Sequence, residues 1–334
     1  MTSRTDFSTS SLSEESRYAL IAWCSLALLL GIVGNIIILH ATIRHSAIKL
    51  DALSVTLIKN IAVSDLGLSL FAVHPSLVSL IWKKWPYGTF LCHAFHYLQL
   101  PSFLSSNLLI CALHISKLTT LLSPLRALAR SKRVAHYISA FIWTLAAIPP
   151  VIQIIVDIHD VYFDTRIFRC MFSYRAPIWN VILPPISIVL GLLPVVIVIG
   201  TTIALLVVVK RARRKTNTQG VFTALFVGCI YLVACTPVVL YTVIHKKIPL
   251  PPDVQRIFEI YVFKLAFFSI FINAMFNIFV YYVSVRSFGE YMRTTALHWI
   301  CRLPHYRKQP FPKRRQSCEM KYKSKARYHL TSVQ

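Results

Sequence analysis

The chain has 334 residues, of which 56% are hydrophobic and only 14% are charged. This composition is too apolar for an ordinary soluble domain and predicts an integral membrane protein. The net charge of +24 would suggest nucleic-acid binding in a soluble protein, but here the position of the cations beside apolar segments matters more, and we expect no nucleic-acid partner.

Seven apolar segments follow one another along the chain, and each is long enough to cross a hydrocarbon core that needs about 20 residues of helix. They are Tyr18–Ile43, Ala52–Trp82, Phe90–Leu122, Ala135–Ile158, Ile178–Val209, Val221–Ile244 and Ile257–Val283. The predicted fold class is therefore an all-α membrane protein, a bundle of seven transmembrane helices. Seven crossings place the two termini on opposite sides of the membrane.

Basic residues predict the orientation of this bundle. They crowd the short segments on one side, including the stretch 210–215, and the C-terminal tail. The loops on the other side hold fewer cations, and Asp157, Asp160 and Asp164 balance those of the second loop. By the positive-inside rule we expect a multi-pass plasma-membrane protein with an extracellular N-terminus and a cytoplasmic C-terminus.

We expect four regions. These are a polar extracellular segment without a cleavable signal peptide (1–17), the seven-helix bundle (18–284), an amphipathic helix on the inner membrane surface (285–300), and a basic, disordered cytoplasmic tail attracted to membrane lipid (301–334). The amphipathic helix is predicted because Phe288, Tyr291 and Met292 recur at helical spacing beside Arg286. Cys301, just beyond it, is compatible with palmitoylation and equally with a free thiol.

Specific residues at specific depths in the helices are more informative than hydropathy. In chain order they are Gly34-Asn35, Asn60-Ile61-Ala62-Val63-Ser64-Asp65, Trp85-Pro86-Tyr87-Gly88 with Cys92, Trp143, Pro194, Thr236-Pro237, and Asn273 to Asn277 with Tyr281 and Phe288. From residue 18 to about residue 300, this ordered set resembles the rhodopsin-like (class A) G protein-coupled receptor family. The resemblance implies a non-enzymatic receptor with an extracellular ligand in its outer cavity and with a heterotrimeric G protein and arrestin as cytoplasmic partners.

The resemblance also implies a disulfide. Cys92 begins the third helix and Cys170 lies in the second outer loop, matching the bridge that holds this loop over the ligand cavity in the family. The oxidising conditions outside the cell allow this bridge to form.

An ionised carboxylate in mid-membrane is costly, so Asp65 needs polar neighbours. The resemblance supplies Asn35, Ser106, Asn273 and Asn277 at the same depth, which together resemble the sodium pocket of the family. An allosteric sodium ion is the only cofactor we expect. The alternatives are a polar cluster that only packs helices and a protonated Asp65.

The cytoplasmic switch departs from the family pattern. Where the third helix usually carries an acid-Arg-Tyr triplet, this chain has Ser116-Lys117-Leu118, and on the sixth helix Asn217 replaces an acid. Lysine keeps the cation but loses the planar fork of arginine. We therefore expect no ionic lock between these helices and raised basal activity, with a signalling-silent receptor as the alternative.

Two further switch positions differ. Cys235 stands two residues before Pro237, where the family usually has Trp, and Tyr231 one turn away is expected to take part of the role of that bulky side chain. Ile278 stands where the family usually has Pro, three residues before Tyr281. Pro237 itself is expected to kink its helix and serve as the hinge of activation.

The ligand cavity is predicted from the same register. Its candidate residues are His96, Gln99, Leu100, Phe103, Lys264 and Phe271. Gln99 stands where amine receptors place an aspartate and Phe271 where opsins need a lysine, so neither a biogenic amine nor retinal is expected. Lys264 either meets a ligand carboxylate or extends to the membrane interface. The mixture of aromatic and neutral polar groups suits a peptide or a small aromatic or lipid-like molecule.

A secondary transporter is the main rival class. A secondary transporter would be expected to show inverted repeats and helices broken at mid-membrane by Gly or Pro at matching positions. The two halves of this chain do not resemble each other.

Overall fold

Long helices make up nearly all of the described chain. The computed structural model describes residues 13–44, 50–122, 131–156, 159–164, 168–174, 177–211, 219–247 and 263–302. Within these ranges, seven helices are long and apolar enough to cross a membrane, which confirms the predicted fold class. The elements are α1 (Glu14–Arg44), α2 (Ala52–Leu68), η1 (Ser69–Val73), α3 (His74–Trp82), α4 (Gly88–Leu122), α6 (Lys132–Val156), β1 (His159–Asp164), β2 (Arg169–Tyr174), α7 (Pro177–Arg211), α8 (Gln219–Lys247), α10 (Phe263–Ser269), α11 (Phe271–Ser284) and α12 (Arg286–Arg302).

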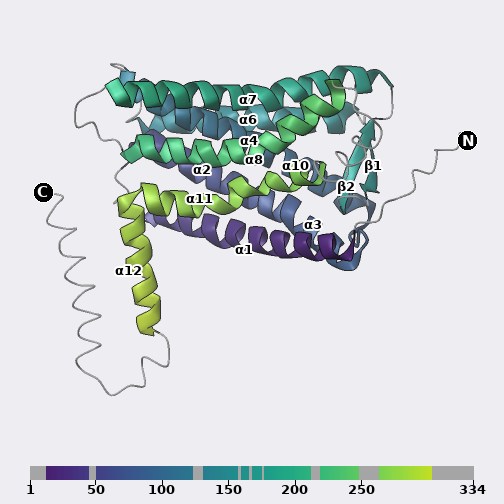
Figure 1. The fold of residues 1–334 in the computed structure, drawn as a ribbon, viewed down its shortest axis with the longest axis horizontal. Coiled ribbons are helices and arrows are strands. Elements are labelled where there is room, and N and C mark those ends of the chain that lie inside the picture. The colour runs from purple at the N-terminus through teal and green to yellow at the C-terminus, as the bar shows by residue number, and fades with distance from the viewer. Residues whose placement is uncertain are drawn as a thin grey trace, which may run out of the picture.

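The ends of the first and last helices differ slightly from the prediction. α1 begins at Glu14 rather than at Tyr18, because Glu14 and Glu15 favour the positive end of a helix dipole. α12 runs to Arg302, so Cys301 lies on its last turn. α12 leaves the bundle at a steep angle at the end opposite the β1–β2 hairpin (Figure 1). We call these two ends of the bundle the hairpin end and the α12 end.

Two of the spans are interrupted. The second consists of α2, the π-helical turn η1 and α3, and Pro75 lies at the start of α3, where its missing N–H breaks the regular hydrogen-bond pattern. The last span is divided at Ile270 into α10 and α11. Next to this break, the Ser269 hydroxyl donates to the Ala234 carbonyl of α8 at 2.8 Å, which ties α10 to α8. The break in the last span therefore lies beside a hydrogen bond to a neighbouring helix.

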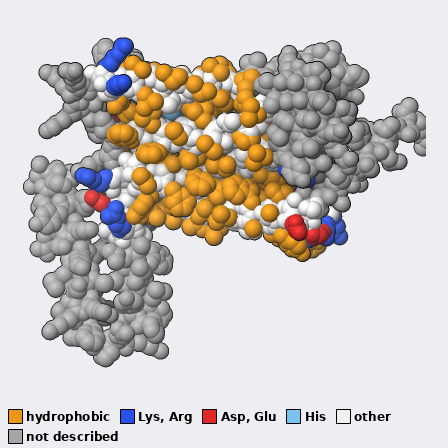
Figure 2. Space-filling model, in the orientation of Figure 1, with side chains coloured by type: hydrophobic (Ala, Val, Ile, Leu, Met, Phe, Trp, Pro, Cys, Tyr) orange, Lys and Arg blue, Asp and Glu red, His pale blue; other side chains and the backbone are white. Residues whose placement is uncertain are grey.

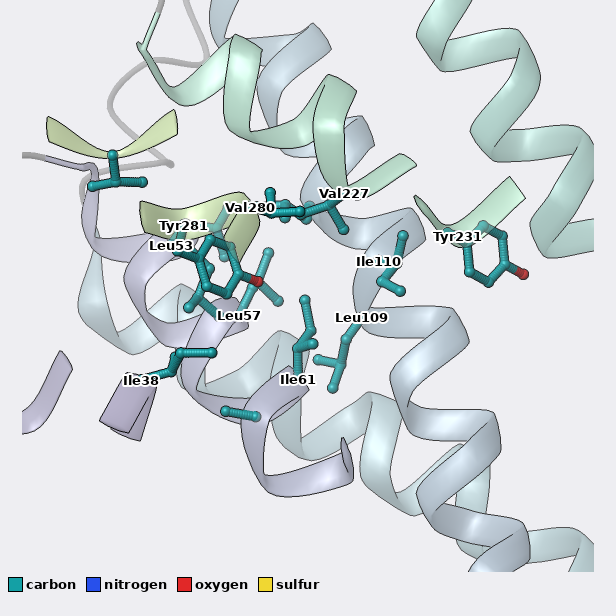
Figure 3. Packing of buried hydrophobic residues seen from close by; sticks show 14 of the residues in the cluster. Ile38, Leu53, Leu57, Ile61, Leu109, Ile110, Val227, Tyr231, Val280 and Tyr281 are labelled. Carbon is teal, nitrogen blue, oxygen red and sulfur yellow. The ribbon is translucent and has the colours of Figure 1, made fainter. Parts of the chain in front are cut away.

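α4 lies at the centre of the bundle and contacts α2, α6, α7 and α8. Its side chains join a large hydrophobic cluster toward the α12 end, to which Leu57 of α2, Ile110 of α4 and Tyr231 of α8 belong (Figure 3). A second cluster lies toward the hairpin end and includes Cys24 of α1 and Phe271 of α11. These two clusters hold the helices together on either side of a polar layer.

The flank of the bundle is apolar, whereas charged side chains gather at its two ends (Figure 2). Large hydrophobic side chains are exposed along α6 and α7, including Phe141, Ile155, Val196 and Ile203. In a membrane such a surface meets lipid chains, and helices are suited to this environment because they satisfy their own backbone polar groups. The chain is therefore a multi-pass membrane protein.

The connection between α6 and α7 contains a β-hairpin that the sequence analysis did not predict. β1 and β2 pair antiparallel, with His159 opposite Tyr174 and Asp164 opposite Arg169. Cys170 of β2 is bonded to Cys92 of α4, which confirms the predicted disulfide. The bond anchors the hairpin to the central helix, so side chains of β2 next to Cys170 are brought to the end of the helix bundle.

Candidate functional site

The five residues predicted to form a sodium pocket lie together in the middle of the bundle. Asp65 of α2 is completely buried, and its carboxylate accepts hydrogen bonds from the Ser106 hydroxyl of α4 at 2.9 Å and from the Asn277 amide of α11 at 2.5 Å. Asn273 donates to the same Ser106 hydroxyl at 3.3 Å. Asn35 of α1 donates to the Ala274 carbonyl at 2.9 Å. One polar layer thus joins four helices.

Three acceptor oxygens of this layer are left unpaired. The side-chain carbonyl oxygens of Asn35, Asn273 and Asn277 are buried and have no hydrogen-bond partner. Buried polar atoms of this kind are nearly always satisfied in native proteins by protein, water or an ion. Oxygen atoms of carboxylates and amides are suitable ligands for hard cations. The residues present therefore fit a small cation beside Asp65.

The other sequence landmarks of α2 also have partners. The Trp143 indole of α6 donates to the Asn60 side-chain carbonyl at 3.0 Å, and the hydroxyls of Ser64 and Ser105 are 2.8 Å apart. These contacts join α2 to α6 and to α4. They account for two further polar residues of α2, Asn60 and Ser64.

The predicted switch residues of α8 and α11 are buried in the cluster toward the α12 end. Tyr231 and Cys235 lie one turn apart on α8 and both belong to this cluster, as does Tyr281 of α11. Figure 3 shows Tyr231 beside the α4 helix, on the far side of Ile110 from Tyr281. Pro237 lies within α8, between these residues and the hairpin end.

Lys117 has a carboxylate partner that the sequence analysis missed. The Lys117 ammonium forms an ion pair with Asp51, and the side chains are only 6% and 20% exposed. Asp51 also caps α2, since it accepts a hydrogen bond from the Ser54 backbone N–H at 2.9 Å. Burial opposes ionisation of Asp51, but the Lys117 ammonium and the Ser54 hydrogen bonds outweigh it and hold the pKa of the carboxyl below its usual value. The pair therefore joins α4 to the start of α2. Asn217, the residue that replaces an acid on the sixth helix, lies outside the described residues.

A glycine of α8 covers the other side of Lys117. A Cβ atom added to Gly220 would lie 3.0 Å from the Lys117 Nζ and 3.1 Å from its Cε. Nearby, Leu205 of α7 and Val221 and Ala224 of α8 form a small hydrophobic cluster against Leu118 of α4. The α12 ends of α4, α7 and α8 are thus in close contact in this structure.

The predicted cavity residues lie toward the hairpin end, in different surroundings. His96 is buried, whereas Gln99, Leu100, Phe103 and Lys264 are partly exposed. Phe271 is fully buried and packs edge-on against Phe268, with ring centroids 5.9 Å apart. In this structure Phe271 is therefore part of the hydrophobic cluster at this end.

Arg169 joins these residues from the hairpin and was not singled out in the sequence analysis. Its guanidinium donates to the Gln99 side-chain carbonyl and lies 4.4 Å from the centre of the Phe267 ring. Burial lowers the pKa of Arg169 to about 9, so the group still carries its charge at neutral pH. The available signal in the sequence was its position directly before the disulfide-bonded Cys170.

The family described as "7 transmembrane receptor (rhodopsin family)" matches residues 34–281. The chain therefore belongs to the rhodopsin-like G protein-coupled receptors, and it is a receptor rather than an enzyme.

Individual receptors are similar to this chain at low identity. The annetocin receptor of Eisenia fetida is 25% identical over 201 residues, which cover 59% of this chain and 48% of that receptor. The neuropeptide Y receptor type 5 of Rattus norvegicus is 29% identical over 132 residues, covering 40% of this chain and 29% of that receptor. The somatostatin receptor type 5 of Rattus norvegicus is 24% identical over 240 residues, covering 67% of this chain and 63% of that receptor. The chain thus spans less than two thirds of the length of each of these relatives.

The Lys117–Asp51 pair predicts a specific pattern of stability. Asp51→Asn leaves a buried ammonium without a counter-charge and removes part of a helix cap, so we expect it to lower the free energy of unfolding by about 2–3 kcal/mol. Adding Lys117→Met removes the uncompensated charge and should restore more than half of this loss. Thermal unfolding of the purified receptor in detergent measures both variants. Equal instability of the single and double variants would contradict the ion pair.

Proposed function

We propose that the chain is a plasma-membrane receptor for an extracellular peptide and activates a heterotrimeric G protein. The main observation in favour of a peptide ligand is the similarity of the chain to receptors such as the neuropeptide Y receptor type 5. The hairpin end supports it, since His96, Gln99, Arg169 and Lys264 offer polar and charged groups to a ligand there. By the positive-inside rule the hairpin end is extracellular, because α7 ends in Lys210 and Arg211 at the opposite end.

The signal is transmitted by α8. Activation in this family opens a cytoplasmic cleft by an outward swing of this helix, and Pro237 is the candidate hinge. A closed resting cleft is supported by the close approach of Gly220 to Lys117 and by the cluster around Val221. The Lys117–Asp51 pair joins α4 to α2, so it does not tie α8 to the bundle. We therefore keep raised basal activity as the expectation, with arrestin as a second cytoplasmic partner.

A peptide screen tests the proposal. Cells that express the receptor are exposed to a library of secreted peptides, and arrestin recruitment is measured because it does not presuppose a particular G protein. We expect at least one peptide to give a saturable response that is absent from mock-transfected cells. Substrate uptake by vesicles that contain the receptor, without any arrestin or G protein response, would instead support the transporter alternative.

The polar layer around Asp65 is proposed to bind sodium and to stabilise the resting bundle. A ligand at about ten times its Kd stabilises a protein by about 1.4 kcal/mol, so sodium chloride in place of choline chloride should raise the melting temperature by about 2–6 °C. Asp65→Asn should abolish this rise. Asp51→Asn, which removes a carboxylate outside the layer, should retain it. A sodium effect of the same size in Asp65→Asn would overturn the assignment.

The contact at Gly220 predicts a gain of basal activity. A Cβ at this position already lies 3.0 Å from the Lys117 Nζ, so the larger side chain of Gly220→Leu needs Lys117 or α8 to move, and we expect α8 to shift toward the open arrangement. A shift of about 1 kcal/mol in this equilibrium corresponds to about a fivefold rise in basal signalling. Gly200→Leu on α7 is the matched control, because nothing lies within 4 Å of the added Cβ. Second-messenger output is compared at equal surface expression, and unchanged output from Gly220→Leu would count against α8 as the moving element.

A further inference from the structure

Arg169 is a buried cation at the hairpin end, and no carboxylate among the described residues forms an ion pair with it. The residue is 4% exposed, and its Nη1 atom is buried without a hydrogen-bond partner. Its other Nη atom donates to the neutral amide of Gln99, and the guanidinium rests on the Phe267 ring. Within the described part of the chain, the ion pairs involve Arg17, Lys83 and Lys117, and Arg169 takes part in none of them.

A second buried arginine at the same end shows how this bundle satisfies such a group. Arg17 is 6% exposed, and its guanidinium donates to Glu14 at 3.0 and 2.5 Å and to the Leu80 carbonyl at 3.0 Å. Arg17 is thus neutralised and hydrogen-bonded by the protein itself. Arg169 differs because its charge is compensated only by an amide oxygen and by the face of an aromatic ring.

The nearest acidic candidate on the hairpin does not neutralise Arg169. Asp164 lies directly opposite Arg169 in the strand register, yet the ion pairs of the described residues do not join them. The first four turns of α4, from Gly88 to Leu100, contain no Asp or Glu, and neither does α10. Lys264, three residues before Phe267 on α10, adds a second positive charge. The local charge therefore favours an incoming anion.

We propose that Arg169 is the anchor for a carboxylate of the peptide ligand, with Gln99 and Phe267 holding the guanidinium in place. This inference rests on the proposed function, since it assumes that a peptide enters at the hairpin end. A guanidinium presents two parallel N–H groups that match the two oxygens of a carboxylate, and Nη1 is the donor left free for one of them. The Cys92–Cys170 disulfide holds the strand that carries Arg169, so the cation is positioned before the ligand arrives.

A peptide can supply this carboxylate from two sources, its C-terminus or an acidic side chain. In both cases the ligand supplies a counter-charge that the described residues do not give to Arg169. A buried charge without its counter-charge raises the free energy of the protein. The unliganded receptor therefore has an unfavourable free-energy term at Arg169, which a bound carboxylate removes.

The first test needs no known ligand. Arg169→Gln removes an uncompensated buried charge, so its melting temperature should equal or exceed that of the wild type. Arg17→Gln is the matched control and should lower the melting temperature by about 2–4 °C, since it removes the hydrogen bonds of a buried guanidinium to Glu14 and to the Leu80 carbonyl. Acetate should raise the melting temperature of the wild type more than acetamide at equal concentration, and this difference should vanish in Arg169→Gln. A fall in Arg169→Gln as large as that in Arg17→Gln would show a purely structural role and overturn the proposal.

The second test uses the peptides that activate the receptor. Each is made with a free C-terminal carboxylate or with an amide, and with each Asp or Glu replaced by Asn or Gln. One of these neutral forms should lose about 30-fold or more in potency on the wild type and on Arg17→Gln, with no such loss on Arg169→Gln. The form that loses potency identifies the source of the carboxylate.

The outcomes separate the two proposals. The role of Arg169 is overturned if the neutral forms of the active peptides are as potent as the acidic forms. It is also overturned if neutral forms lose as much potency on Arg169→Gln as on the wild type. In both cases the proposal that the chain is a peptide receptor still holds. If no peptide activates the receptor, the proposed function fails, and the comparison of acetate with acetamide still decides whether Arg169 binds a carboxylate.

Discussion

The buried carboxylate of Asp65 is the constraint around which the helices are arranged. A charge or a strong acceptor in the middle of a membrane must be given hydrogen bonds by the protein, because neither water nor lipid supplies them there. Ser106 from α4 and Asn277 from α11 meet this need, and Asn35 brings α1 into the same layer. The two hydrophobic clusters then pack on either side of this layer.

The buried cations at the two ends of the bundle differ in the partners that the protein gives them. Toward the α12 end Lys117 is neutralised by Asp51, which also caps α2, so one carboxylate stabilises both a helix end and a contact between helices. At the hairpin end Arg17 is satisfied within the protein, whereas Arg169 is not. In the proposed role of Arg169, this difference leaves one buried cation available to a ligand carboxylate.

Most of the fold could be predicted because the membrane simplifies the problem. Hydropathy revealed the seven spans, and the order of the polar landmarks indicated which helices meet at Asp65. The π-helical turn before Pro75 and the break at Ile270 were not predicted, since the local pattern of apolar residues continues through both. The β-hairpin was missed because its strands are short and part of a loop in which aromatic and charged residues are mixed.

The sequence by itself determined the class of protein, the disulfide and the membership of the polar layer, because these depend on residue types at fixed depths along helices. The partner of Lys117 and the surroundings of Arg169 were decided by the tertiary structure alone. Asp51 lies 66 residues from Lys117, and Gln99 lies 70 residues from Arg169. Such pairs depend on how helices and the hairpin pack in space, and no local sequence pattern records that arrangement.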